Sequence, residues 1–255
     1  MNAKGRAKNS ELLIESFRDE ILRWNKQINL VSRQETGGRL DGLFGQCIGG
    51  FEPVWNKLTR QGDRAVSRIY YFDLGSGGGL PGVLWHILFS EKTTVTPEIT
   101  RPVQTWLVEP REKRAWFLNR LNRIPQMPTF GVLRGRWGEV SFLDGVFSSP
   151  GLASSAVVIS LKALHLDDSE VLGGLRGAFS ANSSSVDVLI VRYYPPAQKF
   201  DQDLLDLLKI PTEGSFREID GFVYRALGGS VVPLMGPGEG LASLVLSSYE
   251  ISARV

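Results

Sequence analysis

The sequence predicts a Rossmann-like α/β fold, with a mostly parallel seven-stranded sheet that has an antiparallel edge, and with an N-terminal helical extension. Three observations support it. Short apolar runs alternate with helical stretches beyond residue 63, a glycine-rich loop follows the first run, and no helix separates the last two runs. We expect a tail and helical extension over residues 1–62 and the sheet domain over residues 63–255.

The N-terminal extension is expected to be helical. Apolar residues recur at three- and four-residue steps over residues 11–30, and Ser10 is a plausible N-cap for that helix. Residues 1–10 are polar, which predicts a disordered tail and neither a signal peptide nor a membrane anchor. A weaker helical region, broken by glycines, covers residues 39–58.

Seven apolar runs predict the sheet, because a buried strand is a short apolar segment that ends at turn residues. The expected strands are residues 69–74, 103–108, 129–133, 156–160, 186–192, 222–227 and 241–249. Helices are expected over residues 80–89, 110–122, 137–143 and 169–179, and a polar loop over residues 93–102.

Composition narrows the possible classes. The 29 basic and 27 acidic residues give a net charge of +2, so a nucleic-acid site would have to be a local basic patch. One cysteine, Cys47, excludes a disulfide framework and favours a buried, inert thiol, and two histidines make a zinc site unlikely. The single cysteine and an apolar run too short to span a membrane favour a cytoplasmic protein. We also expect a monomer without metal.

A glycine-rich loop follows the first expected strand, with the sequence Asp73-Leu74-Gly75-Ser76-Gly77-Gly78-Gly79. Glycines let a backbone approach a ligand closely at the carboxyl end of a parallel strand. A dinucleotide fingerprint would need a third glycine where Leu80 stands, and a P-loop would need Gly-Lys-Ser/Thr. Glu109, at the end of the second strand, can accept hydrogen bonds from both hydroxyls of a ribose, so the pattern favours an adenosyl cofactor.

Three segments resemble one protein family. The run from Asp73 to Gly82 is similar to the D-x-G-[ST]-G-x-G-[FL]-P-G signature of the bacterial RsmG (GidB) proteins. The run from Trp24 to Ser32 is similar to their W-N-x-x-x-N-L-[VT]-S, and the run from Val108 to Leu118 to their strand-end acid followed by x-x-x-K-R-x-x-F-L. The resemblance reaches from about residue 12 to residue 168.

The resemblance implies a class I methyltransferase that uses S-adenosyl-L-methionine to methylate a guanine N7 in small-subunit (16S) ribosomal RNA. Its partner would be ribosomal RNA or the 30S particle. Guanine N7 already carries a lone pair, so positioning can drive the reaction without a general base. The residues expected to bind the cofactor are Asp73, Gly75, Ser76, Gly77, Gly79, Leu80, Glu109, Arg136, Trp137, Gly138 and Lys162.

No catalytic residue can be named, and the candidates on the substrate side are Lys162, Arg192, Asn25 and Asn29. Lys162 can contact phosphate, a guanine acceptor or the cofactor, or can be an exposed loop lysine. Asn25 and Asn29 are expected to share a helix face, where they either bind RNA or fix the helix to the domain. Two other functions stay open, a methyltransferase with a different acceptor and an inactive cofactor-binding scaffold; a nicotinamide oxidoreductase is least favoured.

A basic run lies on the helix expected after the second strand, and consists of Arg111, Lys113, Arg114, Arg120 and Arg123. It either contacts phosphates or is a solvated helix face. We expect Trp24, Trp116 and Phe117 in the core, and His86 and His165 in structural or surface positions.

Overall fold

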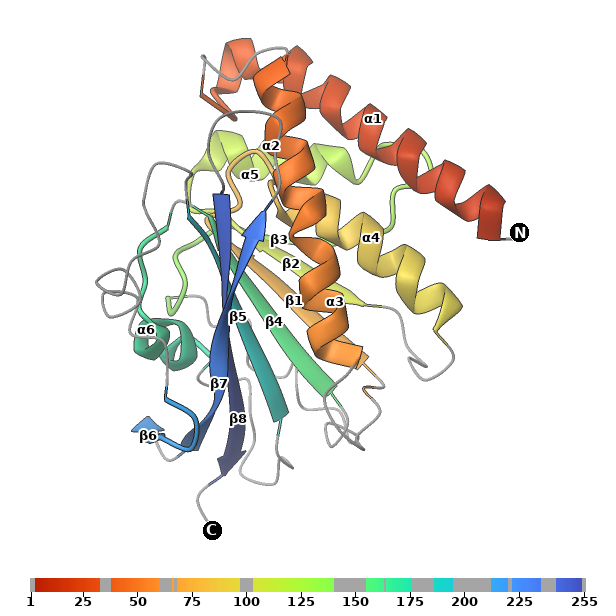
Figure 1. Cartoon of the computed structure of the whole chain (residues 1–255). Coiled ribbons are helices and arrows are strands. Elements are labelled where there is room, and N and C mark those ends of the chain that lie inside the picture. The colour runs from red at the N-terminus through yellow and green to blue at the C-terminus, as the bar shows by residue number, and fades with distance from the viewer. Residues whose placement is uncertain are drawn as a thin grey trace.

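Helices cover both faces of one open sheet in the computed structural model of the chain (Figure 1). The structure describes residues 3–32, 38–59, 66, 68–96, 103–139, 155–162, 164–175, 186–194, 212–219, 222–234 and 242–253. The helices are α1 (Ala3–Ile28), α2 (Gly38–Gly49), α3 (Phe51–Thr59), α4 (Gly82–Val95), α5 (Glu112–Leu121) and α6 (Asp168–Gly173). The strands are β1 (Arg68–Leu74), β2 (Gln104–Val108), β3 (Gly131–Leu133), β4 (Ser155–Lys162), β5 (Val186–Tyr194), β6 (Phe216–Ile219), β7 (Phe222–Leu234) and β8 (Ala242–Ala253).

The strand order is β3-β2-β1-β4-β5-β8-β7-β6. Strands β1 to β5 pair in parallel, whereas β8 is antiparallel to both β5 and β7, so the Rossmann-like sheet with an antiparallel edge is confirmed. The sheet has eight strands instead of seven, because the short β6 pairs with the free edge of β7. In the sequence, the dipeptide Asp220-Gly221 between the two strands is a hairpin signal.

The predicted start of the first helix was wrong. Helix α1 begins at Ala3, so residues 3–10 are not a disordered tail, and Ser10 is buried within the helix instead of capping it. Alanine, lysine and arginine favour helix, and they make up most of residues 3–8. The helix ends at Ile28 because Asn29 takes a left-handed conformation with φ of 56°.

Other boundaries differ by a few residues. The weak helical region is two helices, α2 and α3, which meet at Gly50. Helix α4 continues to Val95, into the segment expected to be a loop. Residues 137–139 form a turn, and α6 ends at Gly173. The remainder of the helices expected over residues 137–143 and 169–179 lies largely outside the described residues.

Apolar side chains form a core on each face of the sheet. The first core joins the sheet to α1–α5 and contains Phe17, Trp85 and Phe117, while the second includes α6 and the Tyr224 and Tyr249 side chains of the antiparallel edge. Side chains alternate along β1, so that Tyr71 enters the first core and Phe72 the second. The first core crosses from the N-terminal helices into the sheet, and the division at residues 62 and 63 stays a prediction.

Candidate functional site

The glycine-rich loop connects β1 to α4 at the carboxyl end of the sheet. Gly75, Gly77 and Gly79 have φ values of 70°, 56° and 89°, a region that side chains with a Cβ rarely adopt. The N–H groups of Gly75 and Ser76 donate to the carbonyl oxygen of Val108 at 2.8 and 3.1 Å. The alternating glycines are therefore needed for the backbone path that ties the loop to the end of β2.

Glu109 follows β2 and is the acid that meets this loop. Its Oε2 accepts a hydrogen bond from the N–H of Gly77 at 2.8 Å, and its Oε1 accepts one from the N–H of Arg111 at 2.9 Å. The side chain is buried, and its own N–H donates to Leu133 on β3. A carboxylate offers about four lone-pair sites. Two of them hold Glu109 in place, and the capacity left fits the two hydroxyls of a ribose.

Asp73 lies beneath the loop and is closed to solvent. Its Oδ1 accepts a hydrogen bond from Ser160 at 2.5 Å, and the hydroxyls of Ser160 and Tyr71 lie 2.9 Å apart. Burial raises the pKa of Asp73 to about 6, although Ser160, Ser76, Gly82 and the charge of Lys162 act in the opposite direction. Asp73 is thus placed to shape the loop from below.

Gly82 begins α4 directly against Asp73. A Cβ on Gly82 would stand 2.5 Å from Oδ2 of Asp73 and 2.6 Å from Cδ2 of Leu107. Among the described residues, Oδ2 of Asp73 has no hydrogen-bond partner of good geometry. Gly82 of the signature therefore allows α4 to pack closely on Asp73.

Three other residues that were expected to bind the cofactor pack against the inside of the protein. Leu80 belongs to the first core, and the Ser76 hydroxyl donates to the backbone oxygen of Asp73 at 2.8 Å. A Cβ on Gly79 would stand 2.7 Å from Val83 and 3.2 Å from Phe17. The structure places these residues where they support the loop by packing.

The segment from Arg136 to Gly138 follows β3, which lies beside the strand that carries Glu109. Arg136 is exposed, and Gly138 has a φ of 85°. The indole N–H of Trp137 donates to the carbonyl oxygen of Val171 at 2.9 Å, and the ring packs against Phe72. Trp137 is thus turned toward α6 and the second core.

The two cations expected on the substrate side have different surroundings. Lys162 ends β4, is half-buried, and lies close enough to Asp73 for its charge to lower the pKa of that carboxyl. The guanidinium of Arg192 forms an ion pair with Asp168, and the two side chains are only 12% and 6% exposed. Arg192 also donates to the oxygen of Leu166 at 2.9 Å, so it fixes the segment between β4 and α6.

Asn25 and Asn29 do not share a helix face, contrary to expectation, because Asn29 lies beyond the end of α1 in a left-handed conformation. The Oδ1 of Asn25 accepts from the N–H groups of Leu30 and Val31 at 2.7 and 2.9 Å. Asn25 is buried and ends the helix, whereas the side chain of Asn29 is exposed.

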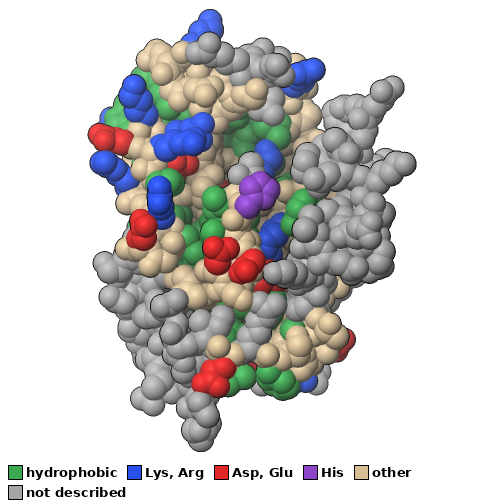
Figure 2. Space-filling model, turned by 90° about the vertical axis from the view of Figure 1, so that its left-hand side faces the viewer, with side chains coloured by type: hydrophobic (Ala, Val, Ile, Leu, Met, Phe, Trp, Pro, Cys, Tyr) green, Lys and Arg blue, Asp and Glu red, His purple; other side chains and the backbone are tan. Residues whose placement is uncertain are grey.

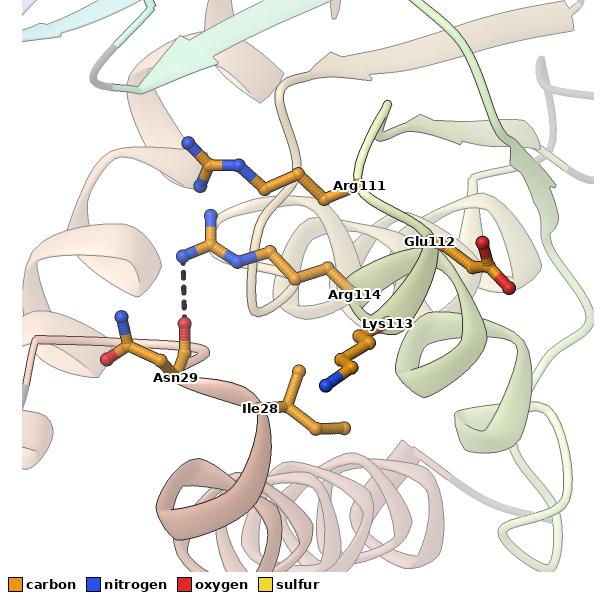
Figure 3. A pocket seen from close by; sticks show the side chains of 6 residues that line it. All are labelled: Ile28, Asn29, Arg111, Glu112, Lys113 and Arg114. Atoms are coloured by element: carbon orange, nitrogen blue, oxygen red, sulfur yellow. Dashed lines mark hydrogen bonds between the residues drawn. The ribbon is translucent and has the colours of Figure 1, made fainter.

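A cleft of about 540 Å³ opens between the end of α1 and the start of α5. It is lined by Ile28, Asn29, Arg111, Glu112, Lys113 and Arg114. Figure 3 shows the guanidinium groups of Arg111 and Arg114 side by side, while Glu112 points away from them. Arg114 donates to the oxygen of Asn29 at 2.8 Å, and burial together with the charge of Arg111 lowers its pKa.

The cleft adjoins the glycine-rich loop. An amino group of Arg114 lies 3.7 Å from the point where a Cβ on Gly77 would stand. Lys and Arg side chains gather in the upper part of the face viewed in Figure 2. Arg114 therefore brings the positive charge of the cleft up to the loop that meets Glu109.

The basic run of α5 divides into two groups. Arg111, Lys113 and Arg114 line the cleft, whereas Arg120 forms an ion pair with Glu20 of α1 at 3.2 Å. Arg123 is exposed. The run is thus neither wholly a solvated face nor wholly part of the cleft.

The expected core position is confirmed for Phe117 but wrong for Trp116, which is 48% exposed; Trp24 is half-buried. At 3.6 residues per turn, Trp116 lies about 160° around α5 from the buried Leu118 and about 140° from the buried Leu121, so the helical period predicts its exposure.

Cys47 and His86 have structural surroundings. Burial raises the pKa of the Cys47 thiol to about 11, consistent with an inert side chain. The two ring nitrogens of His86 lie 2.8 Å from the hydroxyl of Thr105 and 2.9 Å from the oxygen of Pro128. His165 is exposed.

The described residues contain neither a metal-ligand cluster nor a membrane-spanning helix. No group of three or more His, Cys, Asp or Glu side chains there could hold a metal ion. None of the described helices combines the length and the apolar character that a membrane span requires.

Sequence reasoning missed a buried polar group built around Asp168. Its carboxylate pairs with Arg192 and accepts a hydrogen bond from the Tyr249 hydroxyl. The only local signal was the helix-start pattern Asp167-Asp168-Ser169-Glu170, and Asp167 and Glu170 do form a capping box. The partners on β5 and β8 are distant in sequence, so no spacing rule points to them.

Comparison with known families gives one match that covers most of the chain. The model of the GidB family, described as rRNA small subunit methyltransferase G, matches residues 10–184. A protein from Cereibacter sphaeroides named ribosomal RNA small subunit methyltransferase G is 34% identical over 110 residues, which are 43% of this chain and 45% of that protein. A protein of the same name from a Ruegeria species is 35% identical over 80 residues, 31% of this chain and 34% of that protein. The chain thus spans less than half the length of these relatives.

Solved structures are more remote. A TYW2 protein of M. jannaschii in complex with AdoMet has a TM-score of 0.40 and 8% identity, over 81% of this chain and 77% of that chain. A SAM dependent methyltransferase from Aquifex aeolicus has a TM-score of 0.41 and 11% identity, over 85% and 95%.

Proposed function

The chain belongs to the rRNA small subunit methyltransferase G family, and from this we propose that it is an S-adenosylmethionine-dependent methyltransferase that modifies a guanine N7 of small-subunit ribosomal RNA. The observation that carries the proposal is the meeting of the glycine-rich loop with a buried strand-end carboxylate, through the hydrogen bond from Gly77 to Glu109. Loop and acid stand at the carboxyl end of a parallel sheet, where such folds bind ligands.

Glu109 would hold the ribose of the cofactor. Its position is set by the N–H groups of Gly77 and Arg111, so the carboxylate needs no reorganisation before it accepts further hydrogen bonds. Asp73 supports this arrangement from below, since it packs against Gly82 and accepts from Ser160. When bound, the cofactor supplies a methyl group on a positively charged sulfur.

The cations of the cleft would hold the RNA. Arg111 and Lys113 are exposed, and phosphate oxygens are their natural partners. Arg114 joins the cleft to the loop, because it contacts the end of α1 and lies beside Gly77. The protein would then act by holding a nucleotide and the methyl donor in line, since the N7 lone pair needs no base to activate it.

Labelled-methyl transfer tests the proposal. Wild-type protein and labelled S-adenosylmethionine are incubated with 30S particles, or with RNA extracted from them, from a strain that lacks this protein. We expect label in the RNA, recovered as N7-methylguanine, and none with Glu109→Ala. Label in another base or in a protein fraction would instead support a different acceptor, and no label in any fraction would support an inactive scaffold.

A further inference from the structure

Trp116 is an exposed indole on a helix that has a well-formed buried side. It keeps 48% of its surface accessible, while Phe117 and Leu118 beside it are fully buried. A single exposed apolar side chain is common, but Trp116 stands one helical turn from Lys113, which lines the cleft.

The surroundings of Trp116 hold it in place. Its ring meets the ring of Trp24 edge to face, with centroids 4.9 Å apart and an angle of 70°. The indole N–H of Trp24 donates to Glu20 at 3.0 Å. Arg120 and Arg23 lie over the Trp24 ring at 5.1 and 5.9 Å. The face of the Trp24 ring is therefore covered by cations, whereas in the described part of the chain no cation lies over the Trp116 ring.

Cationic side chains lie between Trp116 and the cleft. Lys113 and Trp116 are three residues apart on α5 and lie on one face of the helix. Arg120 and Arg23 share the carboxylate of Glu20, which offsets part of their combined positive charge. Neither Arg111 nor Lys113 has a carboxylate partner among the described ion pairs, so these two cations are available to an anionic ligand.

We propose that Trp116 stacks on an unpaired base of the RNA whose phosphates contact Arg111 and Lys113, an inference that rests on the proposed function. Base stacking on an aromatic ring beside a cationic groove is the usual way in which proteins hold single-stranded RNA. A duplex keeps its bases stacked on each other, so the surface selects unpaired nucleotides next to the cleft.

A lipid surface fits less well. An interfacial helix presents a continuous apolar face, whereas Trp116 is surrounded on its exposed side by Glu112, Lys113 and Arg120. The exposed apolar side chain of α1, Leu12, lies about 18 Å along that helix from Trp24, the neighbour of Trp116. An aromatic ring beside unpaired cations fits a site that stacks bases and contacts phosphates.

Fluorescence anisotropy with a labelled, unstructured RNA of roughly 20 nucleotides, longer than a typical single-strand site, tests the inference. Trp116→Ala and Trp116→Leu are expected to weaken binding about tenfold, because neither retains an aromatic face, while Trp116→Phe retains most of the affinity. Phe216→Ala is the matched control, since Phe216 is 67% exposed on the edge strand β6, and should bind like wild type. The affinity for S-adenosylhomocysteine should stay the same in all four variants.

Equal RNA affinity of wild type and Trp116→Ala would overturn the inference, as would absence of binding by wild type. The same holds if the duplex form of the RNA binds as tightly as the single strand. Vesicles containing phosphatidylserine serve as the second probe: Trp116-dependent binding to them, with RNA binding unchanged, would overturn the inference in favour of a membrane contact. Methyl transfer by wild type is scored separately, so a failed stacking surface and a failed methyltransferase give different results.

Discussion

The backbone N–H of Gly77 donates to Oε2 of Glu109 at 2.8 Å, which joins two segments that are 32 residues apart in the sequence. The loop after β1 and the acid after β2 therefore form one unit. The glycine supplies a left-handed backbone with φ of 56°, and the acid receives its N–H. Changes on either side should alter the same ligand site.

Close packing of α4 on β1 should make Gly82 intolerant of a methyl group. In Gly82→Ala the added Cβ would meet Asp73 and Leu107 at 2.5 and 2.6 Å, so the free energy of unfolding should fall by about 1–3 kcal/mol. Gly45→Ala is the matched control, because nothing lies within 4 Å of its Cβ position in α2. There the change should stabilise by up to about 1 kcal/mol. Urea denaturation measures both, and equal stability of the two variants would refute the packing argument.

The buried pair of Arg192 and Asp168 should be costly to break from one side. Asp168→Ala leaves the guanidinium buried without its counter-charge, so the free energy of unfolding should fall by about 3–5 kcal/mol. Adding Arg192→Met to that variant should recover part of the loss, as measured in a double-mutant cycle.

The more accessible pair of Arg225 and Glu250, whose side chains are 54% and 24% exposed, is the control. Arg225→Ala should change the free energy of unfolding by less than about 1 kcal/mol. If the two pairs cost the same, burial is not the cause of the effect.

Asp73 should make the protein less stable as the pH rises. Burial raises the pKa of Asp73 from 3.8 to about 6, so the folded state binds the proton more tightly than the unfolded chain. Its contribution to stability is present below pH 4 and lost between pH 4 and 6, and the wild type should lose about 3 kcal/mol relative to Asp73→Asn across this range.

His86 acts in the opposite direction, which is why the difference between wild type and Asp73→Asn must be measured. Burial lowers the pKa of His86 from 6.5 to about 4, so its contribution to stability falls as the pH falls through the same range. That contribution cancels in the difference. A difference that does not depend on pH between 4 and 7 would show that Asp73 titrates normally.

Variants of Asn25 and Asn29 should distinguish a side chain that stabilises the fold from one that is free to contact RNA. Asn25→Ala removes the acceptor for the N–H groups of Leu30 and Val31, so the free energy of unfolding should fall by about 1–3 kcal/mol. Asn29→Gly keeps the left-handed backbone and should leave stability unchanged within about 0.5 kcal/mol. A weaker RNA affinity in Asn29→Gly alone would assign the exposed side chain to the RNA.

The sequence was most informative where one short segment determines the structure. The strand before Asp73, the glycines after it and Glu109 could all be predicted, because local apolar runs and turn residues specify them. The pairing of Arg192 with Asp168 and Tyr249 could not, since it depends on how β5, α6 and β8 come together. For Trp116 the helical period predicts exposure and the residue type predicts a core position, and the structure follows the helical period.

Calorimetric titration with S-adenosylhomocysteine tests the central claim most directly. We predict binding of one molecule per chain by wild type, no binding of NAD, and a loss of about tenfold or more in Glu109→Ala, because the ribose loses a charged acceptor. Glu112→Ala is the control, since this exposed neighbour pairs with Arg134 and points away from the cleft cations; it should bind like wild type. Absence of binding by wild type, or equal affinity in Glu109→Ala, would contradict the account.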